Sequence, residues 1–308
     1  MDIEAAQIID DEVRGRLGRR YGPSIDAWFE TLPDQLLDLA HEWHVELGPP
    51  IRRGSVSIVV SCRLADDRPA VLKISPDLRR IAIEGEALIG WRTPHVPTVI
   101  AHDTEHGALL LEAIRPGTAL DESGEVPPTS AIAALVYALH EAVPPVKAVP
   151  PVADRIEALF RAGEANYTRR PDLQDVVSRV LYDRGRRAAM ALAAETSAAQ
   201  VVLHGDLTPV NVLDGGARRG LVAIDPAPCW GEPAFDTVDL LLWQVADLAE
   251  LTARATDLAA RLGLSPERMV RWGASFSAME ALELAEAAPP DSLPTERLRL
   301  LLELTDLN

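Results

Sequence analysis

Three polar residues with the potential for chemistry lie close together in the second half of the chain, within HGDLTPVNVL and AIDPAP. Asp206 and Asn211 are five residues apart, and Asp225 follows fourteen residues later across a predicted hairpin. We expect the three side chains to meet at one end of a small β unit. A carboxylate can orient an acceptor hydroxyl and take its proton, while an amide oxygen and a second carboxylate suit Mg²⁺. The set favours phosphoryl transfer, although each residue alone has an ordinary explanation in a turn or loop.

A lysine in the first half of the chain, Lys73, lies within VLKI among apolar neighbours. An ammonium group is costly to bury without a partner. The helical segment that follows supplies Glu84 and Glu86 as candidate partners. A strand lysine paired with a helix glutamate is how kinase-type enzymes hold the α- and β-phosphates of ATP. Taken alone, Lys73 could equally extend into solvent from an edge strand.

The segment IRRGSVSIV, upstream of this lysine, could be the turn that covers the nucleotide phosphates. Gly54 and Ser55 would let the backbone approach the phosphates, whereas Arg52 and Arg53 could simply be solvated. One glycine is a weak phosphate-loop signal, so this interpretation depends on the rest of the site. His204 is expected to brace its loop by hydrogen bonding rather than to act as an acid or base.

The elements that position these residues divide the chain into two parts. Residues 1–48 read as helical, because large apolar residues recur at helical spacing. Strands are predicted at 55–64 and 68–74, a helix at 77–91, and two more strands within TVIAHDTEHGALLLEAI. After RPGTAL the chain reads as mainly helical, interrupted by short strands at VVL, NVLD and LVAID. We therefore expect an α+β protein with a small sheet-and-helix lobe followed by a mainly helical lobe.

Composition narrows the class of protein. The chain has 308 residues, with 30 Lys and Arg against 47 Asp and Glu, a formal charge of -17 that would repel a nucleic acid. Cys62 and Cys229 lack zinc-type spacing and are expected to be reduced. The acidic N-terminus does not read as a secretory signal, and no apolar run is long enough to span a membrane. These features predict a cytoplasmic protein with no nucleic-acid or membrane partner.

The residues in the second half of the chain resemble the aminoglycoside phosphotransferase family, and more narrowly its branch of streptomycin 6-phosphotransferases and hydroxyurea phosphotransferases. HGDLTPVNVL resembles the family's catalytic loop HGDLHxxNVL, and IDPAPCWGEPAFD is similar to the branch's IDPxPxxGDPxFD segment. The resemblance implies that Asp206 is the catalytic base. It also implies that Asn211 and Asp225 are Mg²⁺ ligands.

The residues in the first half of the chain fit the same resemblance. VLKI places Lys73 on the family's ATP-binding lysine, and IEGEALIGW resembles its EAxxLxxW helix, which favours Glu84 over Glu86 as the partner. LLLEAI would be the hinge, with the backbone of Glu112 and Ile114 facing adenine. The leader AWFETLPDQLLDLAHEW also resembles the branch's N-terminal helix, so the resemblance spans nearly the whole chain.

The resemblance implies a bilobal protein-kinase-like fold. Residues 1–114 would hold the leader helices and the nucleotide-binding lobe, and residues 115–308 the mainly helical catalytic and acceptor-binding lobe. The implied activity is ATP- and Mg²⁺-dependent phosphorylation of a hydroxyl group on a small, cationic molecule. An aminoglycoside antibiotic such as streptomycin is the first expectation, in resistance or self-protection. Thr208, Ala227 and Glu232 depart from the family's pattern, which leaves the acceptor open.

Two other functions remain open at this point. One is a kinase of a non-antibiotic metabolite such as a sugar, amino alcohol or nucleoside, because one fold serves many acceptors. The other is a non-catalytic nucleotide-binding module, and a protein kinase is disfavoured because HRD and APE segments are absent. Four acidic residues could receive the amines of an acceptor or have ordinary structural roles: Glu232, Asp236, Asp239 and Glu280.

Overall fold

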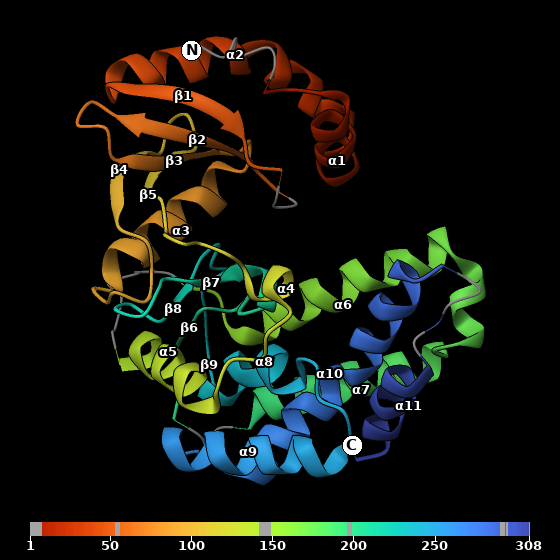
Figure 1. Ribbon diagram of the computed structural model, residues 1–308. Coiled ribbons are helices and arrows are strands. Elements are labelled where there is room, and N and C mark those ends of the chain that lie inside the picture. Colours follow the sequence, from red (N-terminus) through yellow and green to blue (C-terminus); the bar gives the residue numbers. More distant parts are fainter. Residues whose placement is uncertain are drawn as a thin grey trace. The chain divides into compact units, whose positions relative to one another are not determined.

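The computed structural model describes residues 8–52, 56–141, 149–195, 199–289, 293 and 295–307, which form two compact units. One unit extends to Gly117 and the other begins at Thr118. Within the described residues the first unit contains one sheet, three α-helices and a short 3-10 helix, Pro23–Ile25 (Figure 1). In chain order its elements are α1 (Asp11–Tyr21), α2 (Asp26–Glu42), β1 (Val45–Pro50), β2 (Ile58–Leu64), β3 (Pro69–Ile74), α3 (Leu78–Gly90), β4 (Val99–Asp103) and β5 (Ala108–Glu112).

The sheet of the first unit is antiparallel, with strand order β1-β2-β3-β5-β4. β3 is therefore the central strand, and Lys73 pairs with Val59 of β2 on one side and Leu109 of β5 on the other. Because successive side chains of a strand point to opposite faces, Lys73 and Val71 share one face, and Leu72 belongs to the other. We call these the lysine face and the core face.

The leader helices α1 and α2 cover the core face of the sheet, and α3 lies against the opposite side (Figure 1). Leu17 of α1 and Leu32 of α2 are fully buried in one cluster with Val60 and Leu72 of the strands. Burial of this kind is the main favourable term in folding, at about 25 cal/mol per Å² of apolar surface. The leader is thus part of the core of the first unit.

The prediction that residues 1–48 are helical is wrong from Val45 onward, where β1 begins. The helical apolar spacing of the leader continues to Leu47, but Leu47 reaches the same core from a strand. His44 has a φ of 55°, in the left-handed region that breaks a helix. Gly48, Pro49 and Pro50 then weaken the strand signal, so periodicity alone could not separate the two elements.

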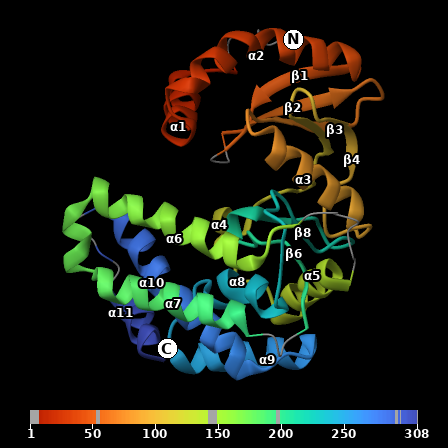
Figure 2. The same ribbon diagram turned by 180° about the vertical axis from the view of Figure 1, so that it is seen from behind.

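The second unit is mainly helical and carries two small antiparallel sheets, β6-β9 and β7-β8 (Figure 2). The hairpin of β7 and β8 agrees with the predicted strands, whereas β9, Cys-Trp-Gly, was not predicted because it lacks the run of apolar β-branched residues that marks the other short strands and ends in glycine. Its described helices are α4 (Leu120–Ser123), α5 (Thr129–Glu141), α6 (Val152–Arg169), α7 (Arg179–Ala194), α8 (Val238–Leu242), α9 (Leu248–Leu262), α10 (Pro266–Ala287) and α11 (Thr295–Leu304). Its strands are β6 (Val201–Leu203), β7 (Val212–Asp214), β8 (Leu221–Ala223) and β9 (Cys229–Gly231).

Helix α10 is the central helix of the second unit and packs against α6, α7, α8, α9 and α11. Its Trp272 and Met269 are fully buried. Both cysteines of the chain are buried and free. In the described part of the chain, no helix combines the length and the apolar character needed to cross a membrane.

Candidate active site

The loop that follows β6 carries the first of the candidate catalytic residues. It runs from His204 to Thr208 and ends in a short 3-10 helix, Pro209–Asn211, before β7. Gly205 adopts a φ of +75°, and a Cβ there would lie 2.1 Å from the carbonyl oxygen of Ala227. Only glycine fits this close approach, which turns the chain so that Asp206 follows directly after a buried strand.

A buried carboxylate fixes the backbone of this loop. Oδ2 of Asp236 accepts a hydrogen bond from the backbone N–H of His204 at 2.7 Å, and Oδ1 accepts one from the N–H of Gly205 at 2.9 Å. Nε2 of His140 lies 2.9 Å from Oδ2. Burial tends to raise the pKa of Asp236, but the hydrogen bond and charge of His140, the charge of His204 and the hydrogen bond from the Gly205 N–H together hold that pKa below its ordinary value. Asp236 therefore braces the loop, one of the two roles considered for it.

The carboxylate of Asp206 is held from two sides. Nη2 of Arg155, on α6, donates to Oδ1 at 2.8 Å, while Nε of the same side chain donates to the carbonyl of Gly205 at 2.7 Å. Nδ2 of Asn211 donates to Oδ2 at 3.2 Å and to the backbone carbonyl of Asp206 at 3.0 Å. The Asp206 side chain remains 24% exposed. It is thus oriented by protein donors and still accessible.

Asn211 and Asp225 are adjacent across the β7-β8 hairpin. The backbone N–H of Ile224 donates to the carbonyl of Asn211 at 2.9 Å, so Asp225 follows immediately after this cross-strand contact. Asp225 has a φ of 56°, a left-handed conformation that aspartate tolerates better than most residues. The structure therefore brings Asp206, Asn211 and Asp225 to one end of the hairpin.

The donor set at this end of the hairpin fits a magnesium ion. The amide nitrogen of Asn211 is committed to Asp206, which leaves its amide oxygen as the atom suited to a hard cation. The carboxylate of Asp225 is a second oxygen ligand of the kind Mg²⁺ prefers. Mg²⁺ usually takes one or two protein ligands and completes its shell with water and phosphate oxygens, so two residues are enough.

His204 is fully buried in this loop. Its Nδ1 accepts a 3.4 Å hydrogen bond from the backbone N–H of Asp206. Burial lowers its pKa, although the charges of Asp236 and Asp206 oppose the effect. A buried imidazole that accepts from the loop backbone stabilises the turn, which is the bracing role expected from the sequence.

In the first unit, Lys73 and Glu84 form the predicted ion pair. Nζ of Lys73 lies 2.6 Å and 2.7 Å from the two carboxylate oxygens of Glu84, and the side chains are 1% and 0% exposed. Glu86 is exposed on the other side of α3. A buried pair with this geometry gives the ammonium a fixed position on the lysine face. Its role in holding a nucleotide stays a prediction.

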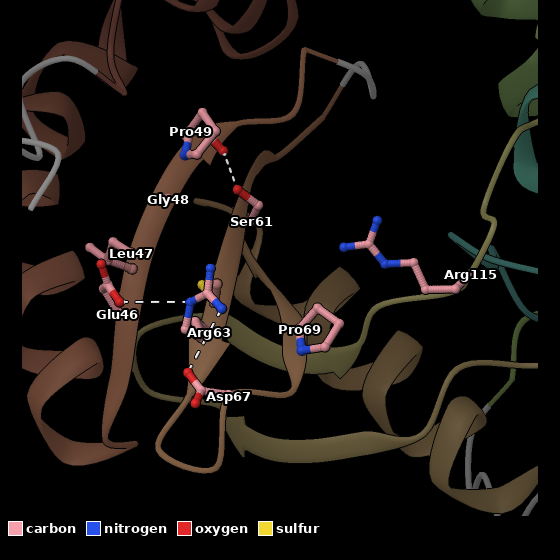
Figure 3. Close-up of a pocket in the computed structure, with 10 residues that line it drawn as sticks. Glu46, Leu47, Gly48, Pro49, Ser61, Arg63, Asp67, Pro69 and Arg115 are labelled. Atoms are coloured by element: carbon pink, nitrogen blue, oxygen red, sulfur yellow. Dashed lines mark hydrogen bonds and ion pairs between the residues drawn. The ribbon is translucent and has the colours of Figure 1, made fainter. Parts of the chain in front are cut away.

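A pocket of about 500 Å³ opens beside the same strands (Figure 3). Ser61 and Arg63 pair with Val71 and Pro69, so by strand alternation they share the lysine face. Arg115, just beyond β5, also lines the pocket, and Figure 3 shows its guanidinium extending toward it. The pocket thus lies between the lysine face and the segment after β5.

The predicted hinge residues lie at this end of the sheet. Glu112 is the last residue of β5, pairs with Ala70, and donates its N–H to the carbonyl of Thr98 at 2.9 Å. Ile114 follows two residues later, before a tight turn in which a Cβ on Gly117 would lie 2.4 Å from the Ile114 carbonyl. The role of these two backbones as a hinge that contacts a base stays a prediction. The proposed phosphate-turn residues Arg53, Gly54 and Ser55 lie outside the described residues.

Three more carboxylates lie near Asp206 in the second unit. Desolvation, followed by the charges of Glu280 and Asp206, raises the pKa of Asp239 on α8 to about 8. Desolvation and the charge of Glu283 raise the pKa of Glu280 on α10 to about 7. Desolvation, followed by the charges of Asp239 and Asp206, also raises the pKa of Glu283, the third carboxyl of this group. These carboxyls add negative potential beside Asp206 when they lose their protons, and a bound cation favours that ionised form.

Glu232 does not belong to this acidic group. It ion-pairs with Arg268 and accepts a 3.0 Å hydrogen bond from the indole N–H of Trp272. Of the four acidic residues considered from the sequence, Glu232 and Asp236 are therefore engaged by protein donors. Asp239 and Glu280 remain as candidates for acceptor binding.

Sequence reasoning missed Arg155 and His140. Both lie on helices far from the catalytic loop in the chain, α6 and α5. Nothing in the local sequence ADRIEALF distinguishes Arg155 from the other helical arginines. Only the packing of α6 against β9 and the loop places its guanidinium on Asp206.

Comparison with known proteins identifies relatives along most of the chain. Residues 42–287 match the family model described as aminoglycoside/hydroxyurea antibiotic resistance kinase. Streptomycin 6-kinase of Streptomyces glaucescens is 26% identical over 86% of this chain and 86% of its own, and hydroxyurea phosphotransferase of Kitasatospora aureofaciens is 30% identical over 82% and 73%. Among solved structures, the APH(2") complex with GDP and kanamycin has a TM-score of 0.56 at 16% identity, covering 89% of this chain and 99% of that one. The predicted protein-kinase-like fold is confirmed.

Proposed function

The chain belongs to the aminoglycoside/hydroxyurea antibiotic resistance kinases, and we propose that it transfers the γ-phosphoryl group of ATP to a hydroxyl group of a cationic small molecule, first of all an aminoglycoside such as streptomycin. The observation that carries this proposal is the Asp206 carboxylate, which is accessible and oriented between Arg155 and Asn211. A loose phosphoryl-transfer transition state needs little covalent help from the protein, and positioned charge supplies most of the catalysis.

Residues 1–114 form the nucleotide-binding lobe in this proposal, and residues 115–308 the catalytic and acceptor-binding lobe. Lys73, held by Glu84, binds the α- and β-phosphates. The backbone carbonyl of Glu112 and the N–H of Ile114 face the adenine. The buried pair at 2.6 Å supports this role, because it fixes an ammonium at the centre of the sheet.

Asn211 and Asp225 hold Mg²⁺ in this proposal. When bound, the ion neutralises charge on the phosphate oxygens. The pairing of Ile224 with Asn211 supports the assignment, because it keeps the two ligand residues at the same end of the hairpin.

Asp206 orients the acceptor hydroxyl for in-line attack and takes its proton. The acceptor oxygen forms a bond to the γ-phosphorus as the bond between that phosphorus and the β-γ bridging oxygen breaks, and ADP leaves with the bridging oxygen. Arg155 keeps Oδ1 of Asp206 in a fixed direction throughout. General-base positioning of this type contributes about 10² to 10⁴ in rate.

The acceptor is cationic in this proposal because Asp239, Glu280 and Glu283 form a group of carboxyls beside Asp206 that becomes negative on ionisation, and a cation favours their ionised forms. Guanidinium and ammonium groups, as in streptomycin, complement such a surface. The same carboxylates also suit a smaller amino alcohol, which keeps a metabolite kinase as the second candidate.

A panel of acceptors tests the proposal. The purified protein is incubated with ATP and Mg²⁺ and with streptomycin, hydroxyurea, choline or a simple sugar, and products are analysed by mass spectrometry for one added phosphate. Phosphorylated streptomycin supports the proposal. Transfer to choline alone establishes the metabolite kinase instead, and no ADP formation with any acceptor would favour a non-catalytic nucleotide-binding module.

A further inference from the structure

One face of the sheet in the first unit carries Lys73 and His102 in a single row across the strands. Lys73 of β3 pairs with Leu109 of β5, and Leu109 pairs with His102 of β4. Residues directly opposite each other in neighbouring strands share a face of the sheet, so His102 lies on the lysine face. Two strand spacings, about 10 Å in all, separate its backbone from that of Lys73.

Helix α3 crosses this row, and two consecutive residues of the helix meet two residues of the row. Glu84 holds the ammonium of Lys73. Gly85 is buried, and a Cβ there would lie 2.7 Å from Cε1 and 2.9 Å from Nε2 of His102, and 2.9 Å from Cδ2 of Leu109. Only glycine fits so close a contact without a shift of the neighbours. The imidazole therefore limits how closely α3 approaches β4, next to the residue that carries the carboxylate of the ion pair.

The edge of the His102 ring that faces α3 has no polar partner. In the described part of the chain, Nε2 of His102 is buried and makes no hydrogen bond. Buried polar atoms without a partner are few in native proteins. In a neutral imidazole with its proton on Nδ1, Nε2 is a bare acceptor. Protonation would place an N–H and a positive charge against Gly85, which costs more free energy because a buried charge needs a partner.

The groups that face His102 come from α3, from β5 and from its own strand. Desolvation lowers the pKa of His102 and outweighs the charges of Glu86 on α3 and of Asp103, the next residue of β4, which act in the opposite direction. Glu84, the other carboxylate in this part of α3, is engaged by the lysine, and β5 contributes the apolar Leu109. The neutral imidazole is thus the form that matches the observed position of α3.

We propose that His102 is a positioning residue for the Lys73–Glu84 pair: the neutral imidazole packs against Gly85 and fixes where α3 crosses the sheet, and the protonated imidazole displaces α3 and loosens the pair. This inference rests on the proposed function only in the role it gives the pair, the holding of nucleotide phosphates. The assembled arrangement binds fewer protons than the displaced one, so nucleotide binding should weaken as pH falls through the range in which histidine titrates.

His102→Gln tests the role of the charge, because glutamine keeps a polar side chain that does not titrate. Affinity for the magnesium complex of the non-hydrolysable ATP analogue adenylyl-imidodiphosphate is measured by calorimetry at about pH 7.5 and about pH 5.5, on either side of the ordinary histidine pKa. Protonation of the analogue is common to both proteins, so their comparison isolates His102. We expect the wild type to lose about fivefold more affinity than His102→Gln between these pH values, the lower end of a typical coupling. Equal losses in the two proteins would overturn the inference.

A steric exchange tests the contact separately from the charge. Gly85→Ala places a methyl group against the imidazole and should weaken binding of the analogue even at the higher pH. His102→Ala makes room for that methyl group, so the double variant should bind the analogue more tightly than Gly85→Ala alone. A double variant that binds no more tightly than Gly85→Ala would also overturn the inference, because the contact with His102 would then not set the position of α3.

His41→Gln is the matched control, since His41 is exposed on α2. It should follow the pH dependence of the wild type. A His41→Gln variant with the same reduced pH dependence as His102→Gln would contradict the assignment to His102. Wild-type protein that binds no nucleotide at either pH would instead refute the proposed function, before any variant is compared.

Discussion

The guanidinium of Arg155 donates to Oδ1 of Asp206 at 2.8 Å and, through Nε, to the carbonyl of the preceding residue at 2.7 Å. One side chain from α6 thus fixes both the backbone and the carboxylate of the proposed catalytic base. Oδ2 is held separately by Asn211. The direction of the carboxylate is therefore set before any substrate binds, which is the preorganisation that phosphoryl transfer needs.

Replacing Arg155 should slow turnover without weakening nucleotide binding. Arg155→Gln removes the charge and the fork of donors, so we expect kcat to fall about 10²-fold, the usual effect of misplacing a reacting group. Arg155→Lys should recover part of the loss. The control is Arg161→Gln, on the same helix but exposed. Equal kcat values for Arg155→Gln and the control would show that Arg155 does not position the base.

Substitutions in the Lys73–Glu84 pair should have different effects on stability and on activity. Lys73→Met leaves the buried carboxylate of Glu84 without its partner, which typically costs about 3–5 kcal/mol of unfolding free energy. Adding Glu84→Leu replaces the pair by apolar side chains and should restore most of that stability. The double variant should still fail to transfer phosphate, as measured by ADP release. A double variant with wild-type activity would refute the role of Lys73 in nucleotide binding.

Asp225→Asn should weaken the response to Mg²⁺. Loss of one carboxylate charge lowers affinity for a hard cation, so the Mg²⁺ concentration for half-maximal activity should rise. Removal of Mg²⁺ with a chelator should abolish transfer in the wild type. Asp214→Asn is the control, because Asp214 is exposed at the other end of β7 and accepts from the N–H of Gly216. An unchanged Mg²⁺ response in Asp225→Asn would argue against metal ligation by Asp225.

Acceptor binding should depend on pH through Asp239 and Glu280. Their pKa values are raised to about 8 and about 7, so both carboxyls lose protons as pH rises from about 6 to about 8. The KM for a cationic acceptor such as streptomycin should therefore fall over this range, while that for neutral hydroxyurea should not. A parallel change for both acceptors would exclude charge pairing as the cause.

The same two groups should make the fold less stable as pH rises. A carboxyl whose pKa is raised on folding binds more protons in the folded state than in the unfolded state. Its contribution to stability is complete below the unfolded value of about 4 and is lost as pH rises through the folded value. Urea denaturation at a series of pH values should show the free energy of unfolding of the wild type falling as pH rises. In Asp239→Asn, the slope of this free energy against pH should be smaller.

Much of this arrangement was predictable from the sequence because it depends on local patterns. The strand that carries Lys73, the helix that carries Glu84 and the hairpin that brings Asn211 to Asp225 each have their own periodicity or turn signal. Strand β1 was missed because Leu47 continues the helical spacing of the leader. Strand β9 was missed because Cys-Trp-Gly lacks the apolar β-branched run by which the equally short strands β6, β7 and β8 were predicted.

The residues that brace the site were harder to predict, because their roles depend on contacts between distant parts of the chain. Arg155 acts on a loop fifty-one residues later, and His140 acts on Asp236 at a separation of ninety-six residues. An arginine or histidine on an amphipathic helix has the same local sequence pattern whether its side chain contacts solvent or a catalytic loop. Tertiary packing alone decides between the two.

Asp206→Ala gives the most direct test of the central claim that this chain is a small-molecule kinase with Asp206 as its base. Phosphate transfer from ATP to streptomycin is measured for the wild type and the variant, together with nucleotide affinity by calorimetry. We predict phosphorylated streptomycin from the wild type, a loss of about 10² to 10⁴ in kcat for Asp206→Ala, and unchanged nucleotide binding. Wild-type turnover in Asp206→Ala would contradict the claim.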